Sequence, residues 1–278
     1  MKPEKQLILS IIGLGNMGSA LLSGIISSGL IEKEKIAIFD IDLQKVKKYE
    51  NDFKVRTFND LKELIFSSKY ILLAVKPQSI HDIMPFLKDY CSIEDNIIIS
   101  IAAGIPTAFF EGSIGDISVL RIMPNTPALY RKGVSAVSSG RFVKGEHIDF
   151  TKSIFRSMGI VVSIEENLQN LATAVSGSGP AYFFLVCKIL TSFAVKKGLE
   201  SATAKKMVIN TMLGAGEVLD KSDKTIDDLI KSVASPGGTT EKALNSFYGN
   251  DLEKIFSEAL DAALKRSAEM ESVISIKE

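Results

Sequence analysis

The stretch Leu7–Leu30, LILSIIGLGNMGSALLSGIISSGL, decides the fold because it changes from a strand pattern to a helix pattern at a glycine turn. An apolar run stops at Gly13, and the spacing GxGxxG follows. Beyond the glycines, apolar residues recur on one helical face, and Gly29 is placed to end the helix. Strand, glycine turn and helix in this order are the context that a dinucleotide-binding motif requires.

Each glycine of the turn has its own physical task. Gly13 permits the tight turn, Gly15 lets a pyrophosphate approach the backbone, and Gly18 allows the helix to pack against the strand. The helix N-terminus adds free N–H groups and a partial positive charge. The stretch therefore predicts a dinucleotide site, with a purely structural glycine turn as the alternative.

Composition restricts the class of protein. The chain has 278 residues, of which 46% are hydrophobic and 24% charged, so it can form two ordinary domains or one large one. Lys+Arg and Asp+Glu both number 33, and this balance gives no indication of a nucleic-acid or anionic-membrane partner. Cys91 and Cys187 lie far apart, without metal-like spacing. These features favour a reduced, cytoplasmic protein without a metal site.

Two further stretches bear on localisation. The N-terminal residues MKPEKQ lack the apolar core of a signal peptide. The longest apolar run, Ala181–Val195, is expected to be too short for a membrane span and contains Lys188. A soluble intracellular protein is the prediction.

Short strands alternate with helices through the first half, as in a parallel sheet covered on both faces. The unusual loops GLGNMG, AVKPQ, IAAG and RIMPNTP each follow a strand, so they are expected at one edge, where ligands bind. The later strands are predicted at Lys35–Asp40, Phe53–Arg56, Tyr70–Val75, Asn96–Ile101, Ser118–Ile122, Val134–Ser138 and Ile160–Ile164.

Asp40 ends the second predicted strand, about twenty residues past Gly18, where an acid hydrogen-bonds the adenosine ribose. This carboxylate favours NADH over NADPH. Asp42 and Lys45 leave the alternative open, because a basic residue there can hold a 2′-phosphate instead.

Helical patterns replace strand patterns in the second half, which puts a domain boundary near Glu165 and predicts domains of residues 1–164 and 165–278. The second of these helices is so apolar that it is either central core or a subunit interface. The helices are predicted at Asn167–Val175, Pro180–Lys197, Ala202–Leu219, Thr225–Ser232, Thr240–Tyr248 and Leu252–Val273.

Two glycine-containing stretches interrupt these helices: SGSGP at 176–180 and SPGGTT at 235–240. A Gly-Gly pair followed by two hydroxyls at a helix N-terminus suits a small anion such as a carboxylate. The alternative is an ordinary N-cap with a proline turn.

The ordered set GLGNMG, AVKPQ, RIMPNTP, SGSGPAY and SPGGTT resembles pyrroline-5-carboxylate reductase over nearly the whole chain. The resemblance implies a Rossmann-like, mostly parallel α/β domain followed by an all-α dimerisation domain. It implies reduction of the cyclic imine 1-pyrroline-5-carboxylate to proline with NADPH or NADH. It also implies homodimers built through the C-terminal helices and often assembled into decamers.

The resemblance further assigns residues to the site. Thr240 is the hydroxyl expected at the ring nitrogen, with Ser235 beside it as a second catalytic candidate. Lys231 departs from relatives that have an acid there, which puts a substrate contact at that position in doubt. The cofactor residues implied are Ile12, Gly13, Leu14, Gly15, Asn16, Met17, Gly18, Asp40, Asn59, Ala74, Val75, Lys76, Pro77, Ile101, Ala102, Ala103, Pro124 and Asn125. The substrate residues implied are Glu166, Ser176, Ser235, Gly237, Gly238, Thr239 and Thr240.

The histidines agree with this chemistry, because His81 and His147 lie outside every motif and are expected to be solvated. A protonated cyclic imine is already electrophilic, so orientation can supply most of the catalysis without an obvious general acid. Two alternatives remain. A β-hydroxyacid dehydrogenase would have a catalytic lysine where this chain has Phe183, and a dinucleotide-binding sensor would have degenerate substrate loops.

Overall fold

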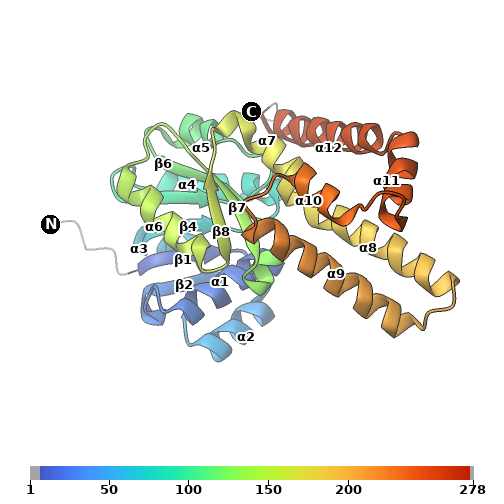
Figure 1. Ribbon diagram of the computed structural model, residues 1–278. Coiled ribbons are helices and arrows are strands. Elements are labelled where there is room, and N and C mark those ends of the chain that lie inside the picture. Colours follow the sequence, from blue (N-terminus) through green and yellow to red (C-terminus); the bar gives the residue numbers. More distant parts are fainter. Residues whose placement is uncertain (1–6, 276–278) are drawn as a thin grey trace. The chain divides into compact units, whose positions relative to one another are not determined.

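The computed structural model describes residues 7–275 and forms two compact units (Figure 1). One unit runs to Ser178 and resumes at Ala263, and the other spans Gly179–Ala262. The N-terminal residues MKPEKQ, on which the signal-peptide prediction rests, lie outside the described residues.

An eight-stranded sheet forms the centre of the first unit, in the order β3-β2-β1-β4-β5-β6-β7-β8. Neighbouring strands are parallel except β6 and β7, which are antiparallel. The predicted mostly parallel α/β fold is therefore confirmed. The strands are β1 Leu7–Ile12, β2 Ile36–Phe39, β3 Arg56–Thr57, β4 Ser68–Leu73, β5 Ile97–Ser100, β6 Ser118–Met123, β7 Gly133–Ser139 and β8 Gly159–Ser163.

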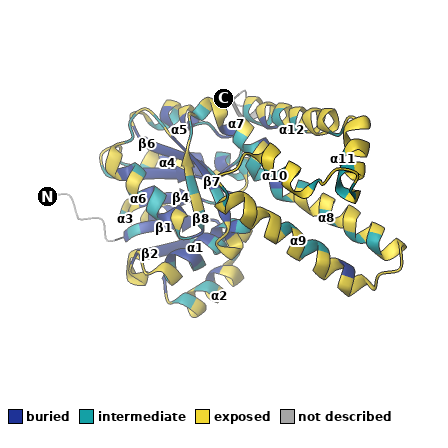
Figure 2. Cartoon of the chain, viewed as in Figure 1, coloured by how far each residue is buried: buried dark blue, intermediate teal, exposed yellow. Residues whose placement is uncertain are grey.

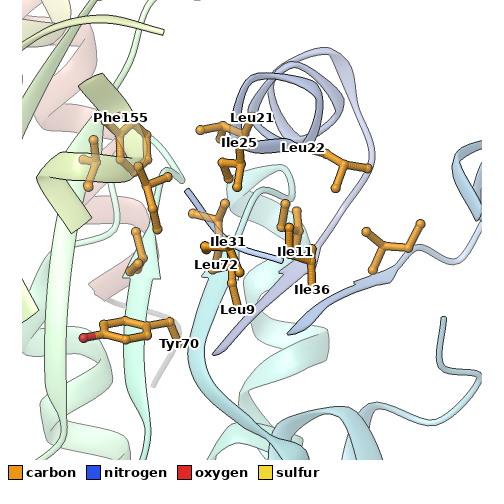
Figure 3. Packing of buried hydrophobic residues seen from close by; sticks show 14 of the residues in the cluster. Leu9, Ile11, Leu21, Leu22, Ile25, Ile31, Ile36, Tyr70, Leu72 and Phe155 are labelled. Atoms are coloured by element: carbon orange, nitrogen blue, oxygen red, sulfur yellow. The ribbon is translucent and has the colours of Figure 1, made fainter. Parts of the chain in front are cut away.

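Apolar side chains from both faces of the sheet build two cores. Leu72 of β4 belongs to one core, which contains residues of α1, α2 and α6 and is drawn in Figure 3. Ile71 and Leu73 belong to the other, which contains residues of α3, α4 and α5. Alternation along a strand buried on both faces explains why its sequence is uniformly apolar. The helices are α1 Asn16–Ser28, α2 Leu43–Phe53, α3 Leu61–Ser67, α4 Ile80–Tyr90, α5 Thr107–Ile114 and α6 Gly145–Arg156, with short 3₁₀ turns η1 Lys33–Lys35, η2 Pro77–Ser79 and η3 Thr126–Tyr130.

Two local predictions in this unit were wrong or incomplete. The strand predicted at Phe53–Arg56 is mostly helix, because α2 continues to Phe53 and ends at Lys54 in the left-handed conformation (φ 58°). Only Arg56 and Thr57 pair with β2. Helix α5 was not predicted, since its eight residues include Gly112 and carry no polar stripe.

His147 also departs from its prediction, because it is buried with 6% of its surface exposed. It lies on the inner face of α6 with Thr151, Ile154 and Phe155, and its ring meets Tyr70 edge-on at 6.2 Å between centroids. Burial lowers the pKa of His147, as do Lys69 and Lys144, while Glu146 opposes the shift. Burial likewise raises the pKa of Tyr70 to about 12, with Glu146 adding to the shift.

The second unit is helical and exposes most of its large apolar side chains. The ribbons of α8 and α9 are mostly yellow in Figure 2, the colour of exposed residues. Its helices are α8 Gly179–Lys196, α9 Ser201–Lys221, α10 Ile226–Val233, α11 Thr239–Gly249 and the start of α12 Leu252–Ser275. The helix predicted at Asn167–Val175 is instead a 3₁₀ turn η4 Glu166–Leu168, a short α7 Gln169–Ala172 and a π-helical turn η5 Thr173–Gly177.

These turns run directly into α8 and make a continuous helical stretch of 31 residues, Glu166–Lys196, in which an 18-residue segment has a mean hydropathy of 1.4. By length and composition alone this stretch could cross a membrane, which differs from the expectation drawn from Ala181–Val195. The difference arises because residues before Gly179 extend the same helix.

The division between the compact units lies at 178/179, after the domain boundary predicted at 164/165. That domain boundary stays a prediction. Gln169 explains the difference, since its Nε2 donates to Ser138 Oγ at 2.8 Å and to Arg121 O at 3.3 Å. This side chain is 1% exposed, so η4 and α7 pack as part of the sheet unit.

Candidate functional site

The glycine turn after β1 needs glycine at two of its three glycine positions, Gly13 and Gly18. Gly13 has φ +100°, and an added Cβ would lie 2.7 Å from Ala74 O. A Cβ on Gly18 would collide with the carbonyl oxygen of Gly13. Gly15 differs, since a Cβ there meets no atom within 4 Å. Two of the glycines therefore close the backbone packing, and the third leaves open space beside the helix.

Helix α1 begins at this open position. Gly15 is its N-cap and no side chain caps the helix, so the first-turn N–H groups are available to a ligand. A pyrophosphate fits these features, because it needs close backbone approach and N–H donors at a helix N-terminus. Ile12, Leu14, Asn16 and Met17 lie in or directly beside this turn.

Asp40 follows β2 and contacts the same turn. Its Oδ2 accepts a hydrogen bond from Leu14 N–H at 2.6 Å, and its Oδ1 accepts one from Asp42 N–H at 2.9 Å. Asp42 caps α2 by accepting from Gln44 N–H and Lys45 N–H. The acid predicted to contact the ribose thus also fixes the glycine turn.

The other predicted cofactor loops follow β3, β4, β5 and β6, whose carboxyl ends share one edge of the sheet. Asn59 is exposed just after β3, and Lys76 is exposed after β4. Pro77 begins the turn η2. The loop Ile101–Ala103 continues the pairing of β5, since Ile101 N–H donates to Leu73 O at 3.1 Å.

Asn125, a predicted cofactor residue, is hydrogen-bonded to Ser176, a predicted substrate residue of the same unit. It is 8% exposed, and its Oδ1 accepts from Val134 N–H at 2.9 Å. Its Nδ2 donates to Ser176 O at 3.2 Å and to Ser176 Oγ at 3.4 Å. Ser176 lies in the π-helical turn, a form that often marks functional sites. A Cβ on Gly177 would lie 2.6 Å from Met123 Cε, so this turn packs closely against the Met123 side chain at the end of β6.

Glu166, a predicted substrate residue, makes hydrogen bonds and an ion pair within the protein. Its Oε1 accepts from Thr107 N–H at 2.7 Å, and its Oε2 accepts from Thr107 Oγ1 at 2.6 Å. Arg121 Nη1 lies 3.4 Å from Oε1. Both carboxylate oxygens are therefore engaged within the protein.

Arg121 itself was missed as a key residue. It is 4% exposed, and its Nη2 lies 3.1 Å from Glu271 Oε2, which also accepts from Asn170 Nδ2 at 3.0 Å. The signal was an arginine within the apolar strand SVLRIM, since a buried cation needs acidic partners. Within the sheet unit, the cluster connects the end of α12 to β6, η4 and α7.

The SPGGTT loop lies in the second unit and precedes α11. Gly237 N–H donates to Glu241 Oε2 at 2.8 Å, and Gly238 N–H donates to Ser235 O at 2.9 Å. The two glycine amides predicted to hold a carboxylate are therefore already engaged. Gly238 is the N-cap of α11 without a capping side chain, and Thr239 and Thr240 form the first turn. Among the described residues, no group of three or more His, Cys, Asp or Glu side chains could hold a metal ion.

Comparison of the sequence with known proteins shows which family it resembles. Residues 166–270 match the model for pyrroline-5-carboxylate reductase dimerisation, and residues 8–104 match that for coenzyme F420-dependent NADP oxidoreductase. The chain is 35% identical over 264 residues to pyrroline-5-carboxylate reductase of Pseudomonas aeruginosa, covering 94% of this chain and 96% of the relative. It is 31% identical to pyrroline-5-carboxylate reductase 2 of Bacillus subtilis, covering 94% of each.

Solved structures agree. A pyrroline-5-carboxylate reductase from Coxiella burnetii superposes with a TM-score of 0.89 at 31% identity, covering 95% of this chain and 98% of that one. The Plasmodium falciparum pyrroline carboxylate reductase with NADP bound superposes with a TM-score of 0.85 at 30% identity, covering 96% and 99%.

Proposed function

The chain belongs to the pyrroline-5-carboxylate reductase family, and on that premise we propose how its residues divide the work of the reaction. It is an NAD(P)H-dependent oxidoreductase that reduces the C=N bond of 1-pyrroline-5-carboxylate to give L-proline. When bound, NADPH or NADH would supply a hydride for the imine carbon, with the C=N π pair passing to the nitrogen. The ring nitrogen arrives protonated, so the protein need only hold and orient the two reactants.

The nucleotide half is assigned to the sheet edge. The α1 N-terminus and Gly15 bind the pyrophosphate, and the loops after β4 and β5 line the rest of the cofactor. The observation that supports this best is the contrast within the glycine turn, because Gly13 and Gly18 are crowded whereas an added Cβ on Gly15 would meet no atom within 4 Å. Asn125 is assigned to the nicotinamide, and Ser176, to which it is hydrogen-bonded, is assigned to the substrate.

The substrate carboxylate is assigned to the first turn of α11. Because the amides of Gly237 and Gly238 are engaged, the N–H groups of Thr239, Thr240 and Glu241 are the better donors. The Thr240 hydroxyl, in the same turn, holds the ring nitrogen as a catalytic residue, with Ser235 beside it. Glu166 acts instead through Thr107 and Arg121, as a positioning residue.

The rest of the assignment concerns assembly and location. The match to a dimerisation domain over 166–270 supports oligomerisation through the C-terminal helices. We propose that these dimers assemble further into decamers and that the enzyme is cytoplasmic. In this assignment the apolar stretch Glu166–Lys196 serves as subunit interface.

A spectroscopic assay tests the reaction. Oxidation of NADH or NADPH is followed at the nicotinamide absorbance with and without pyrroline-5-carboxylate. Substrate-dependent oxidation with proline as product is expected. Cofactor binding without turnover would instead identify a dinucleotide sensor, and turnover of a β-hydroxyacid alone would identify the dehydrogenase alternative.

Thr240→Ala tests the substrate assignment. The variant keeps the backbone N–H donors, so substrate should still bind and the loss should fall on kcat. A hydrogen bond to a charged group contributes about 1.5–3 kcal/mol, so kcat should fall by about ten- to a hundredfold. Gly238→Val should chiefly raise KM, because a Cβ there would lie 2.6 Å from Ser235 Oγ and distort the loop. Near-wild-type kcat in Thr240→Ala with a lowered melting temperature would leave Thr240 a purely structural residue.

A further inference from the structure

The turn between β2 and α2 reads DIDLQK from Asp40 to Lys45, and it contains two acids and one cation. It follows β2 at the same sheet edge as the glycine turn, to which Asp40 is hydrogen-bonded. An adenosine ribose bound across this edge meets the turn first. The chemistry of these six residues therefore decides whether a 2′-hydroxyl or a 2′-phosphate is accepted.

Asp40 is suited to hydroxyl donors. A carboxylate has about four lone-pair sites, and the N–H groups of Leu14 and Asp42 occupy two of them. The remaining sites can accept hydrogen bonds from ribose hydroxyls, which are donors. A phosphate at the 2′ position offers only acceptors and negative charge at neutral pH, so it is repelled.

Asp42 removes two features that would otherwise attract a phosphate. Its Oδ1 accepts from Gln44 N–H at 3.0 Å and Lys45 N–H at 3.4 Å, so two of the first-turn N–H groups of α2 are already used. Its Oδ2 lies 3.6 Å from Lys45 Nζ, which pairs the single cation of the turn. The side chains of Asp42 and Lys45 are 44% and 47% exposed, so the pair faces solvent where a cofactor could reach it.

We propose that the turn Asp40–Lys45 makes this enzyme selective for NADH, with Asp40 accepting the ribose hydroxyls and Asp42 withholding both Lys45 and the α2 N-terminus from a 2′-phosphate. The proposal rests on the proposed function and sharpens it, since a solved relative carries NADP. It separates two roles: Asp40 provides affinity for NADH, and Asp42 provides discrimination against NADPH.

Direct binding without substrate tests the proposal. Dissociation constants for NADH and NADPH are measured by calorimetry, and NADH is expected to bind at least about tenfold more tightly, a difference of about 1.4 kcal/mol. Asp42→Gly frees the N–H groups and Lys45, and glycine is itself a tolerated N-cap. This variant should bind NADPH several-fold more tightly with little change for NADH. Asp40→Asn keeps an acceptor for Leu14 N–H but removes the charge, so it should weaken NADH binding and narrow the ratio.

Asp52→Asn is the matched control, because it removes one negative charge from an exposed position of the same helix. Its cofactor ratio should equal that of the wild type. Equal or tighter binding of NADPH by the wild type would overturn the proposal, as would an unchanged ratio in Asp42→Gly. The reductase assay keeps the two hypotheses apart: turnover with a preference for NADPH refutes only the selectivity, whereas absence of turnover with either cofactor refutes the proposed function.

Discussion

The two compact units differ in where they place their apolar side chains. The sheet unit buries apolar residues on both faces of eight strands, in two large clusters. In the helical unit Gly179–Ala262, Ala204 is the single hydrophobic residue that is buried among those the structure describes. Phe183, Phe184 and Phe193 of α8 are each 62% exposed.

This contrast shows that one unit carries its own core and the other completes its core from outside. Burying a large apolar side chain contributes about 1.5–3 kcal/mol, so a second copy covering α8 would supply most of the stability of the helical unit. An obligate dimer behaves in this way, because its stability depends on protomer concentration. The sheet unit needs no such partner for its own packing.

The largest effect is expected from charges placed on α8. Ile189→Glu combined with Phe193→Glu puts two carboxylates on adjacent turns of the exposed face, and desolvating them in an interface is costly. Light scattering should show monomers, and activity should be lost. Calorimetry should still detect cofactor binding by the sheet unit. Lys205→Glu places a carboxylate at an exposed polar position of α9 and is the control. A stable dimer of the double variant would show that α8 does not form the dimer interface.

A middle-sized effect is expected within the sheet unit. Arg121→Ala leaves the carboxylates of Glu166 and Glu271 without their buried cation, which should cost about 3–5 kcal/mol of unfolding free energy. Urea unfolding measures the loss. Arg266→Ala removes an exposed pair with Glu269 and should cost at most about 1 kcal/mol. Equal losses in the two variants would contradict a structural role for the Arg121 cluster.

The smallest effect concerns pH. Because the folded state lowers the pKa of His147, the unfolded state binds the proton more readily, and stability is lost as pH falls from the unfolded value near 6.5 through the folded one. The melting temperature should therefore drop between pH 7.5 and 5.5. His147→Gln should flatten this slope. Glu146→Gln should steepen it, since Glu146 favours the charged imidazole. Parallel profiles for all three proteins would show that His147 does not contribute.

The sequence was sufficient for the parts of the fold that depend on local pattern. Uniformly apolar strands and the glycine turn predicted the sheet unit, because periodicity and backbone sterics act over a few residues. The residue pattern of β7 does not indicate that this strand runs antiparallel to β6. The Arg121 cluster could not be predicted from local pattern either, because Glu166 and Glu271 lie 45 and 150 positions further along the chain than Arg121. His147 was misjudged because its burial depends on Tyr70, from a strand far along the chain.

The candidate site divides in the same way. Residues with a backbone task, such as Gly13 and Gly18, could be predicted from spacing alone. Side chains with several partners could not. The place of Glu166 near the substrate stays a prediction, and its contacts with Thr107 and Arg121, which engage both of its oxygens, were not predicted. The glycine amides of SPGGTT were predicted to suit a carboxylate, and the contacts that they make with Glu241 and Ser235 were not predicted.

Helix α12 begins in the helical unit and ends in the sheet unit, where Ser267 Oγ donates to Asn170 Oδ1 at 2.8 Å and Glu271 pairs with Arg121. The helical unit is therefore an insertion between two segments of the other unit and not a tail. A chimaera that exchanges this unit between relatives needs two junctions, near 178/179 and 262/263. A single crossover would place a foreign end of α12 against the native Arg121 and Gly104, a position so tight that an added Cβ on Gly104 would lie 3.3 Å from Met270 and Glu271.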